Sequence, residues 1–206
     1  HRELFQLDDQ LQPREIAGVP PDYFNEAGQL WGNPLFDWAR CQEDGYAWWV
    51  SRVRRALSQC DLLRLDHFRG FVAYWSVPFH SDTAKTGQWV PGPGRPLFDA
   101  LTTALGPLPL VAEDLGDITA DVNALRDGLG LPGMAILQFA FAPEPRSEFV
   151  PYAHRQNQVV YTGTHDNNTS VGWWASASAS ERSAASDYLV SGLDNGIHWA
   201  MMQSVS

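Results

Sequence analysis

Cysteine is scarce in this sequence, with only Cys41 and Cys60 among its 206 residues. Two cysteines at this separation have neither the spacing of metal ligands nor the density of a disulfide scaffold. We therefore expect two reduced thiols, buried and unreactive, in a cytoplasmic protein. His80 lacks a set of histidines and acids at helical or strand spacing that would complete a metal site, so we expect a structural or solvated side chain there.

Positive charge is also scarce, since 14 lysines and arginines face 24 aspartates and glutamates and the net charge is −10. Nucleic acids and anionic membranes are bound through basic patches, so this charge argues against both and favours a neutral substrate. No apolar run is long enough to span a bilayer, and residues 1–4 lack the apolar segment of a signal peptide. Because the sequence does not begin with methionine, we expect an internal fragment of a longer protein.

Aromatic residues are abundant, with nine tryptophans and ten phenylalanines. Residues 16–38 contain two adjacent prolines and three glycines without a sustained period, which predicts a long ordered loop. Within it, Tyr23, Phe24 and Trp31 are interleaved with polar residues such as Asn33. Aromatic faces mixed with amides suit a polyhydroxyl ligand, because sugar rings stack on aromatic side chains. The alternative is that these aromatics only pin the loop to the core.

An apolar run at residues 61–65 ends in charge at Asp66 and His67, before a glycine. If the run is a strand, Arg64 and Asp66 leave it by the same face, and the cation favours the ionised carboxylate. An ionised carboxylate at a strand end can act as a nucleophile or stabilise an oxocarbenium ion. The alternative is an ion pair at the edge of a sheet.

Two further apolar runs have the same design. Residues 108–116 deliver Glu113, and residues 159–168 deliver Asp166. The C-terminal ends of the strands carry the active site of a β/α barrel, so these two acids and Asp66 would face one another there. Burial and the adjacent Asp114 would raise the pKa of Glu113, as a general acid needs. Alternatively, Asp114 points away and binds a backbone amide.

The remaining chain alternates predicted strands and helices, which indicates an α/β fold with a parallel sheet. Residues 133–141 read as a buried strand in which Gln138 needs hydrogen-bond partners. Helices are predicted at residues 44–59, 96–105, 119–130, 180–190 and 196–206, loops at 81–96 and 143–158, and a turn at 168–178.

Five sequence blocks resemble the signature blocks of the 4-alpha-glucanotransferases, the amylomaltase or disproportionating-enzyme family. The blocks, in family order, are GVPPDYF, GQLWGNPLFDW, RLDHFRGF, AEDLGDIT and YTGTHDNNTSVGWW. One departure is Asn168, where the family more often has an acid. The resemblance implies that residues 1–206 are part of one incomplete (β/α)8 barrel domain. Earlier strands would precede His1 and the last would follow Ser206.

The resemblance also implies a retaining transfer of α-1,4-glucan segments between maltooligosaccharides, with no metal or organic cofactor. By it, Asp66 is the nucleophile, Glu113 the acid and base, and Asp166 the stabiliser that binds ring hydroxyls. His165 and His67 would donate hydrogen bonds near the cleavage point, although His67 can equally be a structural contact. The expected substrate-binding residues are Tyr23, Phe24, Trp31, Asn33, Arg64, His67, His165 and Asn167.

Three alternatives remain open. An α-amylase-like hydrolase would use the same three acids, with water in place of the acceptor sugar. A glucan-binding protein without catalysis would use the aromatic residues alone. In a third reading, His165 and Asp166 form a metal pair of a phosphohydrolase.

Overall fold

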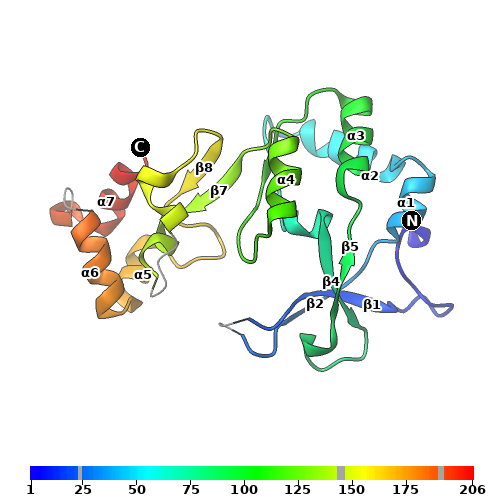
Figure 1. The fold of residues 1–206 in the computed structure, drawn as a ribbon, viewed down its shortest axis with the longest axis horizontal. Helices are drawn as coiled ribbons and strands as arrows, with labels where there is room; N and C mark the ends of the chain where they lie inside the picture. Colours follow the sequence, from blue (N-terminus) through cyan, green and yellow to red (C-terminus); the bar gives the residue numbers. More distant parts are fainter. Residues whose placement is uncertain (23–24, 143–146, 190–192) are drawn as a thin grey trace. The chain divides into compact units, whose positions relative to one another are not determined.

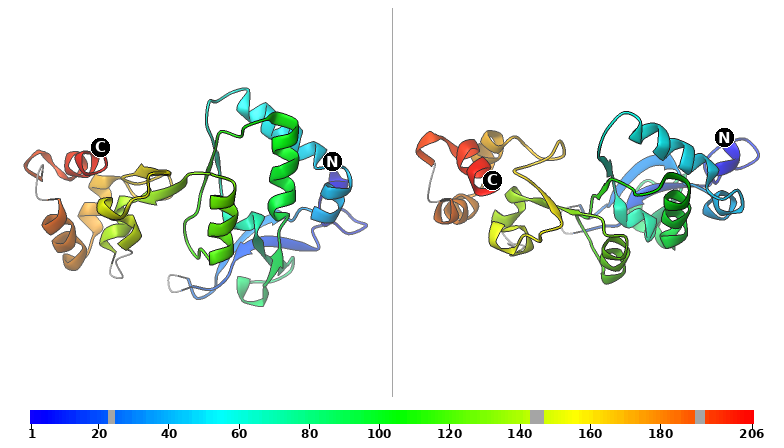
Figure 2. Two further views of the ribbon diagram at one scale, coloured as in Figure 1. Left: turned by 45° about the horizontal axis from the view of Figure 1, so that its top comes forward. Right: turned by 90° about the horizontal axis from the view of Figure 1, so that it is seen from above.

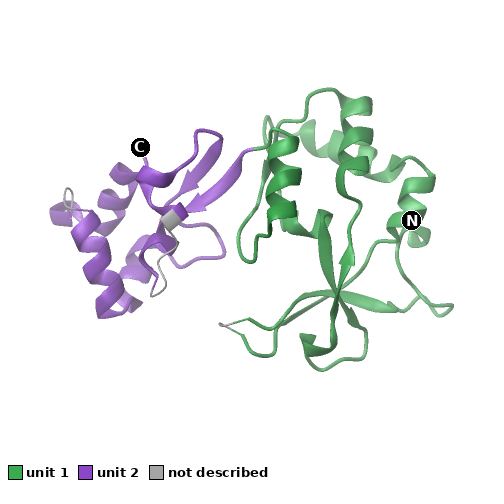
Figure 3. Ribbon diagram, in the orientation of Figure 1, with its two compact units in different colours: residues 1–131 green, residues 132–206 purple. Residues whose placement is uncertain are grey.

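The structure, a computed structural model, describes residues 1–22, 25–142, 147–189 and 193–206. It contains two compact units, His1–Leu131 and Pro132–Ser206 (Figure 3). Each unit has a pair of parallel strands and its own helices, which confirms an α/β fold. Within the described ranges, no helix is both long and apolar enough to cross a membrane.

The first unit combines a four-stranded antiparallel sheet with a parallel strand pair (Figure 1). The antiparallel sheet has the order β2-β1-β4-β5, and the parallel pair joins β3 to β6. The strands are β1 (Glu15–Val19), β2 (Gln29–Pro34), β3 (Leu63–Leu65), β4 (Ala73–Pro78), β5 (Gln88–Pro91) and β6 (Leu110–Ala112). The helices are α1 (Trp38–Glu43), α2 (Ala47–Leu57), α3 (Gly94–Leu105) and α4 (Ala120–Gly128).

Helices α2, α3 and α4 confirm three predictions made from apolar periodicity. Helices α2 and α3 pack against each other, as Figures 1 and 2 show. Their apolar faces bury a core that includes Phe68, Phe98 and Leu101, together with Leu110 from β6. The predicted stop of α3 at Gly106 is confirmed, because this residue has φ +79°, a conformation that favours glycine.

The second unit has β7 (Gly133–Ile136) paired in parallel with β8 (Gln158–Tyr161). Its helices are α5 (Ser170–Ser176), α6 (Ala179–Tyr188) and α7 (Ile197–Ser204). Helices α6 and α7 confirm the predictions for residues 180–190 and 196–206. Helix α6 begins with a capping box, in which Ser178 and Glu181 satisfy each other's backbone N–H groups.

The loop predicted at residues 16–38 is wrong as secondary structure. Strands β1 and β2 pair within it, with Gly18 opposite Leu30. A Cβ on Gly18 would lie 2.4 Å from the Gln29 carbonyl oxygen, so glycine is needed for this close approach. Strand β2 is exposed along most of its length, and an exposed edge strand needs no apolar alternation to mark it.

Three further boundaries differ from the predictions. The expected loop at residues 81–96 contains β5, which is short and pairs only with β4 among the named strands. The expected strand at residues 133–141 ends at Ile136 and continues as a 3-10 helix, Leu137–Phe141. The expected turn at residues 168–178 contains α5, capped by the Thr169 hydroxyl, which accepts a bond from Gly172 N at 3.0 Å. The glycines and prolines around β5, and Gly172 within α5, made these two segments resemble a loop and a turn. The end of β7 was hidden by full burial, because a buried strand and a buried helical turn are both apolar.

Both cysteines are free thiols. Cys41 is buried, and this burial raises the pKa of its thiol to about 11, which keeps it protonated and unreactive. Cys60 is exposed, so the prediction that both are buried is wrong for it. It follows the end of α2, beyond the buried face of that helix.

Candidate active site

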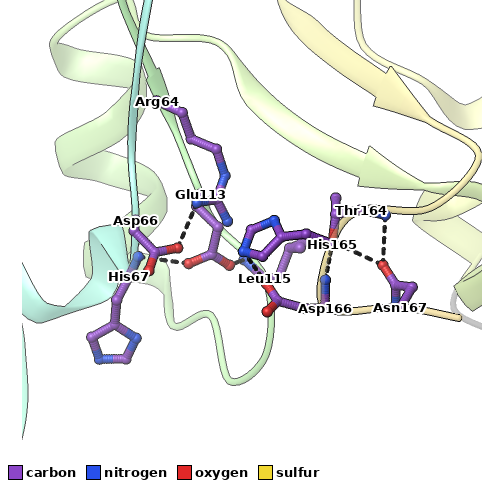
Figure 4. A network of polar contacts seen from close by, with 9 residues as sticks. All are labelled: Arg64, Asp66, His67, Glu113, Leu115, Thr164, His165, Asp166 and Asn167. Atoms are coloured by element: carbon purple, nitrogen blue, oxygen red, sulfur yellow. Dashed lines mark hydrogen bonds and ion pairs between the residues drawn. The ribbon is translucent and has the colours of Figure 1, made fainter.

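Asp66 follows β3 directly and is paired with Arg64. The Arg64 Nη1 to Asp66 Oδ1 distance is 2.6 Å, and the Asp66 side chain is 74% exposed (Figure 4). Alternation along β3 sends both side chains to one face, as predicted. The carboxylate therefore has a fixed cation on one side and access to ligand on the other.

Strand pairing brings Glu113 beside this position. In the parallel register Leu65 lies opposite Ala112, so the next residues along the two strands, Asp66 and Glu113, are neighbours. Two backbone bonds continue the pairing past the strand ends: Glu113 N donates to Leu65 O at 2.9 Å and Phe68 N donates to Glu113 O at 3.0 Å. The first two predicted catalytic acids therefore share one edge of the first unit.

The Glu113 carboxylate accepts two backbone hydrogen bonds. His67 N donates to Oε2 at 2.7 Å, and Leu115 N donates to Oε1 at 3.0 Å. Burial nevertheless raises the pKa of Glu113 above its ordinary value, and the charge of Asp66 adds to this. The two N–H bonds and the Arg64 charge act in the opposite direction without cancelling the effect of burial. The predicted direction is confirmed, and it suits a general acid.

The predicted role of Asp114 in this pKa is wrong. Asp114 is buried and forms an ion pair with Arg126 of α4. The carboxylate that helps to raise the pKa of Glu113 is Asp66, which lies on the neighbouring strand. The alternative prediction was correct that Asp114 points away from Glu113, and one group that it meets there is the Arg126 guanidinium. Sequence adjacency suggested the pairing with Glu113, whereas the alternating direction of side chains along an extended segment separates the two.

His67 shapes the turn after β3. Its backbone is left-handed, with φ 48° and ψ 54°, and this turn aims its N–H at Glu113. The imidazole meets the edge of Trp31 at a centroid distance of 4.7 Å. Burial lowers the pKa of His67, which favours the neutral ring as a hydrogen-bonding group.

A cavity of about 230 Å³ opens beside Asp66 in the first unit. The predicted residues Trp31, Asn33, Asp66 and His67 all contribute to its wall. Tyr23 and Phe24, also predicted as binding residues, lie outside the described residues. Sequence reasoning missed four aromatic residues of the wall, which are Trp38, Trp49, Phe71 and Tyr74. Their spacing resembles that of core residues, and no local signal separates a cavity wall from a core.

In the second unit, Asp166 lies in a tight turn after β8. His165 Nε2 is 3.4 Å from Asp166 Oδ2, and both side chains are exposed. The Asn167 Oδ1 accepts bonds from the Thr164 backbone and hydroxyl at 2.9 and 3.0 Å, which fixes the turn (Figure 4). The described residues contain no group of three His, Cys, Asp or Glu side chains arranged to hold a metal ion.

Gln138 supports the same turn region from the 3-10 helix that follows β7. Its side-chain amide nitrogen donates to the Asn168 carbonyl at 2.9 Å, which confirms that this buried amide has a partner. A Cβ on Gly163 would lie 2.6 Å from that same nitrogen. The small residue at 163 therefore admits the amide that holds the turn.

Known proteins match this chain over its whole length. A family model described as 4-alpha-glucanotransferase matches residues 1–206. The chain is 47% identical over 204 residues to the chloroplastic/amyloplastic 4-alpha-glucanotransferase DPE1 of Arabidopsis thaliana, covering 99% of this chain and 35% of that protein. It is 46% identical over 209 residues to the 4-alpha-glucanotransferase of Thermus thermophilus, covering 98% and 42%.

A solved structure agrees with these matches. The amylomaltase from Streptococcus agalactiae, in complex with acarbose, superposes with a TM-score of 0.93 at 38% identity and covers 98% of this chain and 41% of that one. The chain thus spans less than half the length of these relatives. On the full-length family match, the chain belongs to the 4-alpha-glucanotransferase family.

Proposed function

We propose that this chain supplies the catalytic acids of a retaining 4-alpha-glucanotransferase acting on α-1,4-glucans and maltooligosaccharides. The observation that carries the proposal is the pairing of Asp66 and Glu113, two carboxyl groups in contrasting environments. Asp66 is exposed and held by a cation, whereas Glu113 is half-buried with a raised pKa. Opposite protonation of two neighbouring carboxyl groups is the requirement for cleaving a glycosidic bond.

In the first step, an Asp66 oxygen attacks the anomeric carbon while Glu113 gives its proton to the leaving glycosidic oxygen. The products are a covalent glycosyl ester on Asp66 and a shortened glucan. In the second step, the Glu113 carboxylate takes the proton of an acceptor hydroxyl, whose oxygen attacks the anomeric carbon and releases Asp66. Asp166 is proposed to bind ring hydroxyls, with His165 and Asn167 beside it in the same turn.

Transfer rather than hydrolysis requires an acceptor sugar in place of water. The aromatic cavity beside Asp66 supports this choice, because Trp31 presents a partly exposed ring for stacking and Asn33 an amide for hydroxyls. We therefore propose sugar binding for the β1–β2 segment, although it is not the loop expected from its sequence. The relative from Streptococcus agalactiae, solved with acarbose, adds support for an oligosaccharide ligand.

We further propose that the parallel strands belong to an incomplete (β/α)8 barrel. Three strands, β3, β6 and β8, are each followed closely by an acid, namely Asp66, Glu113 and Asp166. This position after the strand is where barrel enzymes carry their catalytic residues. The two free thiols fit a reducing compartment, and we propose the cytoplasm.

The test is product analysis with the full-length protein and maltotriose, with and without added glucose. A ladder of shorter and longer maltooligosaccharides is expected from transfer. Glucose and maltose alone would instead establish the α-amylase-like hydrolase, and unchanged maltotriose would establish binding without catalysis. Asp66→Asn should abolish the ladder, whereas the exposed surface variant Asp99→Asn should leave it unchanged.

The roles of the two acids can be separated with α-maltotriosyl fluoride, whose leaving group needs little protonation. In the first turnover, Glu113→Gln should release fluoride much faster than it cleaves maltotriose, because only maltotriose needs the acid to form the glycosyl ester. Asp66→Asn should lose both activities, since the nucleophile is required for each. Equal losses on both substrates for Glu113→Gln would contradict the acid role.

A further inference from the structure

The segment from Glu113 to Thr119 is anchored by two buried guanidiniums. It leaves β6 at the proposed acid and base, and it enters α4 after Thr119. Between its anchors lies Leu115, whose N–H donates to the Glu113 carboxylate. The position of this donor therefore depends on what fixes the segment.

Arg69 provides the first anchor, and it comes from the turn that carries Asp66. It is 92% buried, in the 3-10 helix Phe68–Phe71 that follows His67. Its Nε donates to the Asp117 carbonyl at 2.8 Å, and its Nη2 donates to the Thr119 hydroxyl at 3.2 Å. Its guanidinium plane also covers Trp89, with Cζ 3.9 Å from the ring centroid.

Arg126 provides the second anchor from α4. Its Nη1 pairs with the Asp114 carboxylate, and both side chains are almost completely buried. The two anchors thus hold positions 114 and 117, one on each side of the Leu115 and Gly116 pair. Gly116 has φ +90°, so the backbone between the anchors bends sharply.

We propose that Arg69 is a positioning residue for Glu113. Arg69 ties together the two segments that supply the N–H donors of this carboxylate, His67 from the turn after β3 and Leu115 from the segment after β6. The two-pronged, stacked geometry requires a guanidinium, because an ammonium would make a point contact and lose the planar fit to the ring. Its catalytic consequence rests on the proposed transferase function, whereas the anchoring itself does not.

The experiment compares wild type, Arg69→Lys and Arg69→Met in the full-length protein. Hydrogen exchange of the Leu115 amide should become about tenfold faster in both variants, because the segment opens more readily without its anchor. The kcat for transfer from maltotriose should fall by about tenfold to a hundredfold while KM stays within about twofold. The alkaline limb of the pH profile should move to higher pH, since losing the Leu115 bond removes a group that lowers the pKa of Glu113.

Two further variants keep the test decisive. Arg95→Met removes an exposed arginine that pairs with Asp99 on α3, and it should change neither the exchange nor the pH profile. Thr119→Val removes one acceptor of Arg69 at an exposed position, and it should shift both readouts in the direction of Arg69→Lys even if Arg69→Met fails to fold.

The outcomes separate the two proposals. If the hydrogen exchange rate of the Leu115 amide is unchanged in Arg69→Lys and Thr119→Val, the anchoring proposal is overturned, whether or not the protein catalyses transfer. A fall in kcat with an unmoved alkaline limb would reduce Arg69 to a general structural role. A wild-type protein that makes no ladder from maltotriose would refute the proposed function, and the exchange measurement would still decide whether Arg69 anchors the segment.

Discussion

The buried Arg126–Asp114 ion pair allows a quantitative prediction about stability. The two side chains are only 3% and 4% exposed. Removing one member of such a pair leaves the other charge in a poorly solvated place, which costs about 3–5 kcal/mol. We therefore expect Arg126→Met to lower the free energy of unfolding by this amount. Arg126 also contacts Asp127, but that carboxylate is 59% exposed and adds little.

A matched surface pair provides the control. Arg95 and Asp99 are 55% and 59% exposed and stand one turn apart on α3. Pairs of this kind contribute about 0.3–0.5 kcal/mol, and Arg95 also donates to the Gly128 carbonyl at 3.0 Å in an exposed contact, so Arg95→Met should lose only about 1 kcal/mol or less. Both variants replace an arginine by methionine, so the difference between their losses of stability reports the effect of burying the ion pair.

The measurement is urea unfolding of wild type, the three single variants Arg126→Met, Asp114→Leu and Arg95→Met, and the double variant Asp114→Leu/Arg126→Met. The double variant should lose less than Arg126→Met alone, because it removes the stranded carboxylate together with its partner. Midpoint shifts at constant slope would show a change in stability rather than in the denatured state. A loss below about 1 kcal/mol for Arg126→Met, or a double variant equal to the sum of the singles, would refute the reasoning.

Two other predictions concern the proposed acid and the glycines. Because burial raises the folded-state pKa of Glu113 above 4.5, its contribution is fully favourable below the unfolded pKa and is lost as pH rises through the folded pKa. Urea unfolding across pH should therefore show wild type losing stability relative to Glu113→Gln as pH rises, and a constant difference would contradict this. Gly18→Ala should lower the free energy of unfolding by about 1–3 kcal/mol or more, because the added Cβ meets the Gln29 carbonyl oxygen. Gly128→Ala should raise the free energy of unfolding by about 0.4–1 kcal/mol, because a Cβ has space at this position at the end of α4. Thermal unfolding of the two variants checks this, and equal shifts would be the contrary result.

Much of the proposed site could be predicted from local patterns. Apolar runs that stop at an acid identified the ends of β3, β6 and β8, because a buried strand must be apolar and its end is the first place where charge can reach solvent. Alternation along β3 predicted the Arg64–Asp66 pair, which the structure contains at 2.6 Å. Periodicity likewise predicted the helices that form the core.

Other features depend on partners that are distant in the sequence. Strands β1 and β5 are defined by pairing with β4, and β2 is defined by pairing with β1, so their own composition resembles that of loops. Asp114 sits beside Glu113 in the sequence, yet its partner is Arg126, twelve residues further on. No local pattern predicts which group a buried charge will pair with, because the packing around the charge determines its partner.

The sequence by itself therefore determined the three acids, the strands that present two of them together and the helices that cover those strands. These depend on side-chain alternation and periodicity, which are properties of the backbone geometry of each segment. Only the tertiary structure decided the donors of Glu113, the carboxylate of Asp66 that adds to its raised pKa and the arginine that ties its segment to the turn of Asp66. Arg69 and Thr119 are 50 residues apart in the chain, and desolvation and hydrogen bonding over such a separation exist only once the chain has folded.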